Sequence, residues 1–257
     1  MIDPLYSLSG FFVGALVGLT GVGGGSLMTP LLILLFGIHP ATAVGTDLLF
    51  ASCTKSIGVA VHARGHTVDW RVTGLLAAGS LPVAALTIAV LYRLDIHASA
   101  VSQIITPVLA VAILGAAVLL LFQKRFLRWA GPFTENIAPA NLDLATVATG
   151  GVLGVLVTLS SVGAGALGVG ALSLLYPRMR IARIVGSDIA HAVPLTLLAG
   201  AGYWFLGAVD WALLGSLLTG SVPGIVLGSL LAARVPAYAI RSALAATLIA
   251  VAGKLLF

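Results

Sequence analysis

The chain has 257 residues, of which 60% are hydrophobic and 8% are charged, and its mean hydropathy is +1.14. Soluble domains carry roughly 25% charged residues, so this composition excludes a water-soluble protein and indicates a polytopic α-helical membrane protein. The net charge of +5 could indicate an acidic partner, but basic cytoplasmic loops explain it better. The single cysteine, Cys53, excludes an intrachain disulfide and a multi-cysteine metal site.

Eight apolar runs follow one another along the chain, four in each half. Six of them have the length of about 20 residues that one membrane span needs, whereas the first and the fifth have about 30. The runs are Leu8–Gly37, Ala41–Val61, Val72–Tyr92, Ala98–Phe122, Val147–Tyr176, Ile184–Leu206, Trp211–Ala232 and Ala237–Phe257.

Glycines interrupt both of the long runs near the middle. The first break is Gly21–Gly25 and the second is Ser161–Gly165. Glycine lets the backbone leave the helix and approach a ligand closely. Inside a bilayer such irregular backbone is tolerated only where protein or a wet cavity takes up its polar groups. Each break is therefore a candidate site.

The two breaks belong to a larger duplication. At an offset of 140, Val22–Gly25 meets Val162–Gly165, and after one inserted residue the offset becomes 141. Paired, interrupted hydrophobic segments in two halves are the best sequence indication of a transporter's binding site. The motifs aligned at 141 are Gly45-Thr46-Asp47 with Gly186-Ser187-Asp188, Val68-Asp69-Trp70 with Val209-Asp210-Trp211, and Gly79-Ser80-Leu81-Pro82 with Gly220-Ser221-Val222-Pro223.

The topology depends on whether each broken run crosses once as a kinked helix or returns as a re-entrant hairpin. Hairpin arms would have roughly 13 residues, or ~20 Å, too short to cross a ~30 Å core. Hairpins place ten basic residues on one side of the membrane and two, Arg93 and Lys254, on the other. Full crossings divide the basic residues without a bias. The positive-inside rule therefore favours hairpins. The ten are Arg64, Arg71, Lys124, Arg125, Arg128, Arg178, Arg180, Arg183, Arg234 and Arg241.

Each half then has three full spans, an odd number, so the second half is inverted relative to the first and both termini lie outside. We predict an all-α polytopic membrane protein with two inverted-topology repeats, each a glycine-broken re-entrant helical hairpin plus three transmembrane helices. The first repeat comprises residues 1–123 and the second 147–257, joined by a cytoplasmic linker at 124–146, and all of them form one integral membrane domain.

These motifs resemble the sulfite exporter TauE/SafE family over nearly the whole chain. The first half shows Gly21–Gly25, Ser26-Leu27, Thr29-Pro30 and His39–Asp47, and the second shows Ser161–Gly165 and Gly186-Ser187-Asp188. The resemblance implies a bacterial inner-membrane transporter that moves sulfite, organosulfonates or related small sulfur-containing anions, usually outward. Membership alone does not fix the substrate. Ala164 and Ala166 replace Gly24 and Ser26 of the first break, so we expect unequal half-sites.

A small anion needs hydrogen-bond donors and positive potential, and helix N-termini supply both without a buried charge. If the arm after each break begins at Gly25 or Gly165, the two N-termini form a two-fold anion cradle. We therefore predict substrate binding at the breaks; the alternative is that these glycines only permit close helix packing. The predicted binding residues there are Gly23, Gly24, Gly25, Ser26, Gly163, Ala164 and Gly165.

Lys55 is the basic residue deep inside an apolar run, where a charge is costly enough to indicate function. It could attract the anion or titrate to couple transport to protons, and its structural alternative is an ion pair with a membrane carboxylate. Asp47 and Asp188, one per half, are the candidate partners and the predicted coupling residues. Capping or snorkelling near the surface accounts for both aspartates equally well.

His191 follows Asp188 by three residues and so shares nearly the same helix face. It could bind substrate or carry a coupling proton, or it could be a neutral histidine that is hydrogen-bonded inside the bundle. Thr54 lies seven residues after Asp47 and is the best candidate for a substrate-binding hydroxyl, although most such hydroxyls bond to carbonyls of their own helix.

We conclude from the sequence that the chain is a secondary carrier and not an enzyme. It has no ATP-binding motif, so an ion gradient or the substrate gradient must drive it. A channel with the same cradle, or a carrier of another small carboxylate or sulfur anion, is the first alternative. A membrane-embedded enzyme is the second, and it is disfavoured because no nucleophile has a base at useful spacing. We expect the lipid bilayer, a small anion and a coupling proton as partners, no nucleic acid, no metal and no cofactor, and we leave a homodimer open.

Overall fold

The computed structural model describes residues 3–20, 25–94, 96, 98–134, 139–163, 165–231 and 237–256, and these residues form helices and connections without a strand. Membrane-embedded helices satisfy their own backbone polar groups, which open strands cannot do in lipid. The helices are α1 (Pro4–Thr20), α2 (Gly25–Phe36), α3 (Pro40–Arg64), α4 (Trp70–Arg93), α5 (Ser99–Thr134), α6 (Pro139–Ser160), α7 (Ala166–Leu175), α8 (Ile181–Phe205), α9 (Trp211–Leu231) and α10 (Ala237–Leu256).

Six helices of the described part are long and apolar enough to cross a membrane. This agrees with a polytopic membrane protein. The number matches the six runs of about 20 residues in the sequence, but the set differs. Asn141–Ser160 of α6 qualifies, whereas in α10 Ala245–Leu255 counts as a shorter apolar helix.

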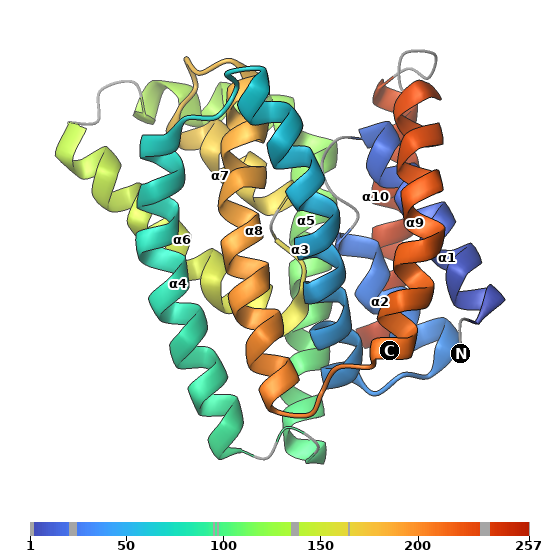
Figure 1. Cartoon of the computed structure of the whole chain (residues 1–257). Coiled ribbons are helices and arrows are strands. Elements are labelled where there is room, and N and C mark those ends of the chain that lie inside the picture. Colours follow the sequence, from blue (N-terminus) through green and yellow to red (C-terminus); the bar gives the residue numbers. More distant parts are fainter. Residues whose placement is uncertain are drawn as a thin grey trace.

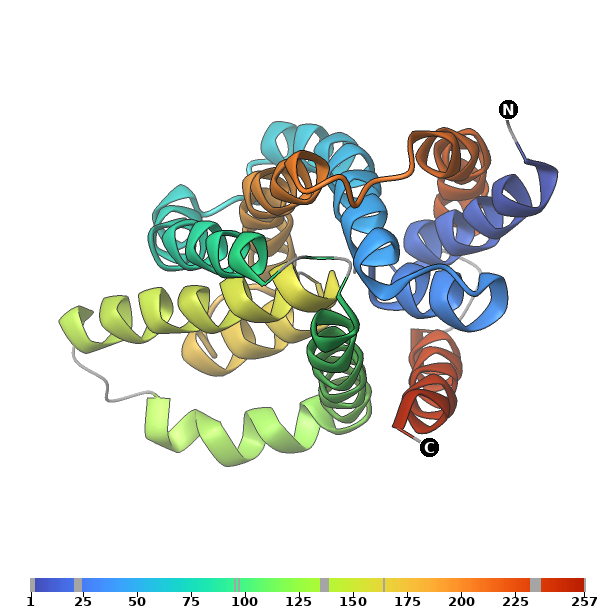
Figure 2. The same cartoon turned by 90° about the horizontal axis from the view of Figure 1, so that it is seen from below.

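Helices α3 and α8 lie side by side at the centre of the bundle (Figure 2). The pair α1 and α9 packs on one side of them and the pair α4 and α6 packs on the other. Helix α5 contacts α10 and α7. Several of the fully buried polar residues, among them Asp47, Asp188 and His191, lie on α3 and α8.

Two opposite ends of the bundle are distinct (Figure 1). Both termini lie at the lower end of the view, with the α2–α3 and α8–α9 connections, and we call this the terminal end. The α3–α4 and α7–α8 connections lie at the other end, which we call the basic end. The α1–α2 pair starts and finishes at the terminal end, and the α6–α7 pair starts and finishes at the basic end. Five arginines lie at the basic end: Arg64, Arg71, Arg178, Arg180 and Arg183.

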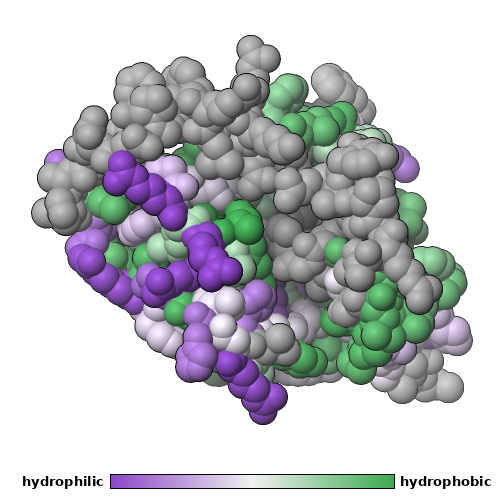
Figure 3. Space-filling model, turned by 90° about the horizontal axis from the view of Figure 1, so that it is seen from above, coloured by the Kyte–Doolittle hydropathy of each residue, from purple (hydrophilic) through white to green (hydrophobic). Residues whose placement is uncertain are grey.

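Seen from above, the basic end carries hydrophilic side chains gathered over one part of its surface, beside apolar side chains elsewhere (Figure 3). Such a polar cap on an otherwise apolar body is typical of the part of a membrane protein that faces water.

Both long runs are broken where the sequence predicts it. Helix α1 ends at Thr20 and α2 begins at Gly25; α6 ends at Ser160 and α7 begins at Ala166. In the second break Ser161, Gly163 and Gly165 have φ angles of 57°, 130° and 132°. These values explain the glycines, because residues with a Cβ rarely adopt them. The predicted site residues Gly23, Gly24 and Ala164 lie outside the described residues.

The expectation of equal hairpin arms of roughly 13 residues is wrong. Helix α1 has 17 residues and α6 has 22, whereas α2 has 12 and α7 has 10. Proline at the first helical position lets α1 and α6 begin before the apolar run does. At 1.5 Å per residue α6 is about 33 Å long, so its length does not prevent it from crossing a bilayer.

The expected linker at 124–146 is largely helical. Helix α5 continues to Thr134 and α6 begins at Pro139. The division of the chain into residues 1–123 and 147–257 stays a prediction.

Glycines make the tightest helix seams, and the same contacts recur in both halves of the chain. A Cβ on Gly79 would collide with the carbonyl oxygen of Val147, and one on Gly220 would collide with that of Ser7. Gly154 packs against Ser80, and Gly14 packs against Ser221 in the same way. The two glycines are 140 residues apart and the two serines 141, which are the offsets found in the sequence. Small residues of this kind let membrane helices approach backbone to backbone.

The repeated Thr-Asp and Ser-Asp motifs contact the repeated Val-Asp-Trp motifs across the α3–α8 centre. The Asp69 N–H donates to the Ser187 hydroxyl over 2.8 Å, and the Asp210 N–H donates to the Thr46 hydroxyl over 3.1 Å. Asp69 caps α4 by accepting from the backbone of Arg71 and Val72. Each hydroxyl thus fixes the start of a helix in the other half.

Candidate functional site

Asp47 and Asp188 occupy matched places on the two central helices. Each lies seven residues after the first residue of its helix, Pro40 in α3 or Ile181 in α8, and each is fully buried with 0% exposure. They are too deep in their helices to cap an N-terminus, and burial excludes snorkelling to the surface. The alternatives that remain for this pair are a structural ion pair and a coupling site.

Lys55 completes a buried ionic cluster that we define as Asp47, Lys55 and Asp188. Lys55 lies two turns beyond Asp47 on α3, is 6% exposed, and interacts electrostatically with Asp188 and Asp47. A buried charge is tolerated when opposite charges lie close to it. The structure therefore brings together three of the residues that the sequence singled out.

Asp47 is held by the helix that follows the first break. Thr29 of α2 donates to the same oxygen, Oδ2 of Asp47, from its backbone N–H over 3.2 Å and from its hydroxyl over 2.5 Å. Thr29 is itself fully buried. From the second break, the Ser161 hydroxyl approaches Asp47 without completing a hydrogen bond to it. The helix after the first break and a residue of the second break therefore both lie near the same carboxylate.

Asp188 has fewer hydrogen-bond partners than Asp47 in the described part of the chain. It packs against α7, where a Cβ on Gly168 would collide with its Oδ1. The Gly165 backbone N–H approaches from the second break, yet neither carboxylate oxygen completes a hydrogen bond within the described part of the chain. The position that matches Thr29 is Val169, which has no hydroxyl to offer. Lys55 is the charged group that faces Asp188.

One buried apolar cluster includes a residue that follows the first break and residues at the second break. Leu27 near the start of α2, Val162 in the second break and Ala166 at the start of α7 belong to one buried apolar cluster. Helices α2 and α7 each reach the ionic cluster, α2 through Thr29 and α7 through the backbone of Gly168. The backbone of Gly25 opens α2 and Gly165 is the residue before α7, as the cradle hypothesis requires.

His191 is buried inside the bundle and bonded to a neighbouring helix. Its Nε2 lies 2.7 Å from the hydroxyl of Ser80 on α4, and its Nδ1 has no hydrogen-bond partner in the described part. It interacts with Lys55, so it borders the ionic cluster, but its hydrogen bond goes to Ser80 and not to Asp188. This is the arrangement of a neutral, hydrogen-bonded histidine.

The Thr54 hydroxyl bonds to its own helix and not to the ionic cluster. Its hydroxyl donates to the carbonyl oxygens of Phe50 and Ala51, over 2.9 and 3.2 Å, within its own helix. The hydroxyl that meets Asp47 is that of Thr29. Sequence reasoning missed Thr29, Ser161, Ser80 and Gly168 as neighbours of the cluster. The signal for Thr29 was its place after the first break, in the Thr29-Pro30 motif.

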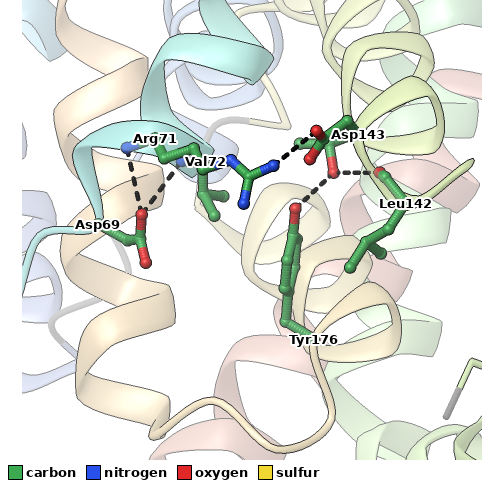
Figure 4. Close-up of polar contacts among 7 residues, drawn as sticks. Asp69, Arg71, Val72, Leu142, Asp143 and Tyr176 are labelled. Atoms are coloured by element: carbon green, nitrogen blue, oxygen red, sulfur yellow. Dashed lines mark hydrogen bonds and ion pairs between the residues drawn. The ribbon is translucent and has the colours of Figure 1, made fainter. Parts of the chain in front are cut away.

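A second polar cluster lies at the basic end (Figure 4). Arg71 of α4 and Asp143 of α6 form an ion pair of 2.7 Å, and Thr146 of α6 bonds to the Tyr176 hydroxyl over 2.8 Å. Asp69 also pairs with Arg183 at the start of α8 over 3.2 Å. These contacts join α4, α6 and α8 at the end where the α7–α8 connection lies.

Comparison with known proteins gives a consistent result. The family described as "Sulfite exporter TauE/SafE" matches residues 6–255. The chain is 41% identical over 214 residues to "Probable membrane transporter protein YjnA" of Bacillus subtilis (strain 168), covering 83% of this chain and 84% of that protein. It is 27% identical to "Probable membrane transporter protein YdhB" of the same organism, covering 82% of each. No solved structure matches.

Proposed function

This chain belongs to the sulfite exporter TauE/SafE family, and from that premise we propose that it exports sulfite or small organosulfonates across the bacterial inner membrane as an ion-gradient-coupled secondary transporter. Membership confirms the resemblance found in the sequence and makes the protein a membrane transporter. The observation that carries the substrate class is that the helix after the first break and a residue of the second break both lie beside one buried ionic cluster.

The chemistry of this place suits a small anion. Two helices, α2 and α7, reach the cluster, and their first N–H groups and their dipoles favour negative charge. Lys55 adds a cation that is almost fully buried. The Thr29 and Ser161 hydroxyls lie within the same site. We assign substrate binding to these groups and to the two breaks.

We also propose the inverted-repeat architecture and its orientation. Matched glycine seams and matched hydroxyl contacts at offsets of 140 and 141 support a two-fold relation between the halves. The α1–α2 pair and the α6–α7 pair start and finish at opposite ends, as inverted hairpins would (Figure 1). The arginines of the basic end favour a cytoplasmic location for that end, with both termini outside.

Alternating access is favoured over a channel because the breaks approach one central site from the two halves. Saturable flux that depends on a counter-ion supports the carrier. Conductance that grows linearly with voltage would support the channel.

The first test is binding, measured as thermal stabilisation of the purified protein by sulfite, methanesulfonate, taurine, sulfoacetate, sulfate and chloride. Exchange of ³⁵S-labelled sulfite in proteoliposomes is then compared between wild type and Lys55→Ala. We expect at least a ~30-fold loss of exchange, because the buried cation is removed from the site. Lys254→Ala, at an exposed position near the end of α10, should leave exchange unchanged.

A bulky residue in the break provides the complementary variant. Gly25→Leu should abolish exchange in a folded protein, whereas Gly74→Leu, where nothing lies within 4 Å of an added Cβ, should be silent. Full exchange by folded Gly25→Leu would contradict the cradle. Stabilisation by none of the sulfur anions would contradict the substrate class.

A further inference from the structure

We propose that Asp188, and not Asp47 or His191, carries a proton that moves together with each transported anion. This inference rests on the proposed anion transport and names the coupling residue of the same site. The three candidates were equivalent in the sequence, and the structure distinguishes them by the contacts that each one makes.

The charge of the cluster explains why a proton is needed. Asp47 and Asp188 with Lys55 leave one net negative charge in a place where no member is more than 6% exposed. A monovalent sulfonate would raise this to two, and uncompensated buried charge is strongly unfavourable. One proton bound to a carboxylate returns the loaded site to its original charge. The two helix N-termini then have to stabilise only the remaining negative charge.

Asp47 is a poor place for this proton. Both hydrogen bonds that Thr29 gives to its carboxylate, from the N–H and from the hydroxyl, end on Oδ2. These donors stabilise an ionised carboxylate. A proton on Oδ2 would displace one of them, and a proton on Oδ1, where no hydrogen bond ends in the described part, would remove the charge that strengthens both. Charge-assisted bonds of this kind are stronger than neutral ones, so Asp47 serves as the fixed negative partner of Lys55.

His191 is also unsuitable. A charged histidine needs an acceptor at each ring nitrogen, and the Nδ1 of His191 has none in the described part of the chain. The added positive charge would also lie beside Lys55, with which His191 interacts. The bond to Ser80 is therefore the role that the geometry supports.

Asp188 has no hydrogen bond to lose on protonation, since none ends on either of its oxygens among the described residues. On α3, Lys55 is the charged group that interacts with Asp188, and Lys55 also interacts with Asp47. On α8, the titratable neighbour of Asp188 is His191. The described residues of α7 include no titratable side chain. The charged residues of α4 and α6 that the structure describes, such as Arg71 and Asp143, lie at the ends of their helices.

Helix α7 is the element that would respond to the proton. Gly168 brings its backbone against the Asp188 carboxylate, so the charge of Asp188 acts directly on the short arm that follows the second break. The step is a simple proton transfer: water on one side gives a proton to a carboxylate oxygen of Asp188, and the new O–H bond breaks to water on the other side. The anion and the proton then move in the same direction, so the outward gradient of the anion drives export against any inward proton gradient.

The test separates exchange from proton movement in proteoliposomes of the full chain. One assay follows exchange of labelled sulfite or methanesulfonate between two loaded compartments, which requires no net proton transfer. The other follows proton movement driven by an anion gradient, using a trapped pH-sensitive dye with the membrane potential clamped. Wild type should do both. Asp188→Asn should lose the proton movement at least about tenfold more than it loses exchange.

Infrared difference spectroscopy locates the proton directly. Addition of methanesulfonate to wild type should produce the C=O band of a protonated carboxyl group, and Asp188→Asn should lack it. Thr29→Val, which removes a donor from Asp47, should leave the position of the band unchanged. His191→Gln should keep the proton movement. If Asp188→Asn does not fold, Asp188→Glu should keep the proton movement and shift the band.

Several outcomes would overturn the assignment. A band or proton movement that persists in folded Asp188→Asn excludes Asp188, and a band that shifts in Thr29→Val assigns the proton to Asp47. Exchange by wild type without proton movement excludes a coupled proton but leaves anion transport intact. No exchange of any sulfur anion by wild type overturns the proposed function, and the proton carrier with it.

Discussion

Thr146 and Tyr176 at the basic end correspond, at an offset of 140, to Tyr6 and Phe36 at the terminal end. The first pair makes a hydrogen bond of 2.8 Å, and the second makes an edge-to-face ring contact with centroids 4.9 Å apart. Arg71, which pairs with Asp143, corresponds to Ala212. These matched pairs therefore touch at both ends, but one contact is a hydrogen bond with an ion pair beside it and the other is an aromatic contact.

The same contrast appears inside the protein. The glycine seams of the two halves are alike, whereas Thr29 beside Asp47 is matched by Val169 on the helix beside Asp188. Backbone packing tolerates little change, because any added atom collides. Side chains that face the cluster or the two aqueous ends can differ, and these are the places where the halves perform different tasks.

The largest expected effect tests the glycine seams that the two halves share. Gly79→Ala and Gly220→Ala each place a Cβ against the backbone of the facing helix, at Val147 or at Ser7. Since backbone cannot yield as a side chain can, we expect each variant to lose about 3 kcal/mol or more of unfolding free energy. Thermal unfolding in detergent measures the loss.

Gly74→Ala is the control, because nothing lies within 4 Å of a Cβ there. Its midpoint should stay close to that of wild type, as expected for a surface substitution that changes stability by less than about 0.5 kcal/mol. Severe damage from only one of the two seam variants would contradict their structural equivalence.

The sequence predicted the parts of the fold that depend on repetition and composition. It indicated the family, the helical membrane class and the positions of both breaks, since clustered glycines disfavour a continuous helix even within an apolar run. It did not indicate the lengths of the arms, because α6 begins at Pro139, in a stretch where Asn141 and Asp143 interrupt the apolar residues.

The sequence predicted the charged residues of the site but not the hydroxyl groups that contact them. Buried charges such as Lys55 are rare enough to be noticed in any apolar run. Thr29 and Thr54 look alike in sequence, and only the packing of α2 on α3 decides which hydroxyl meets Asp47. The pairing of His191 with Ser80 likewise depends on how α4 lies against α8.

The next largest effect is expected at Thr29, which is matched by Val169 in the second half. Thr29→Val should cost about 1–3 kcal/mol of stability, because it removes a hydroxyl donor from the buried Asp47 carboxylate. Thr87→Val should cost much less, since the Thr87 hydroxyl donates to the Val83 carbonyl of its own helix. Equal midpoints for the two variants in thermal unfolding would argue against a special role for Thr29.

The smallest effect is expected at the two ends. The Arg71–Asp143 pair has side-chain exposures of 71% and 32%, so a double-mutant cycle of Arg71→Ala and Asp143→Ala should give about 0.2–1 kcal/mol. Salt screens such a pair, and the coupling energy should fall when the cycle is repeated at high ionic strength. A Tyr6→Ala and Phe36→Ala cycle should give a similar energy, about 0.5–1.5 kcal/mol, that salt leaves unchanged. Equal salt dependence of the two cycles would show that the chemical contrast between the ends has no energetic consequence.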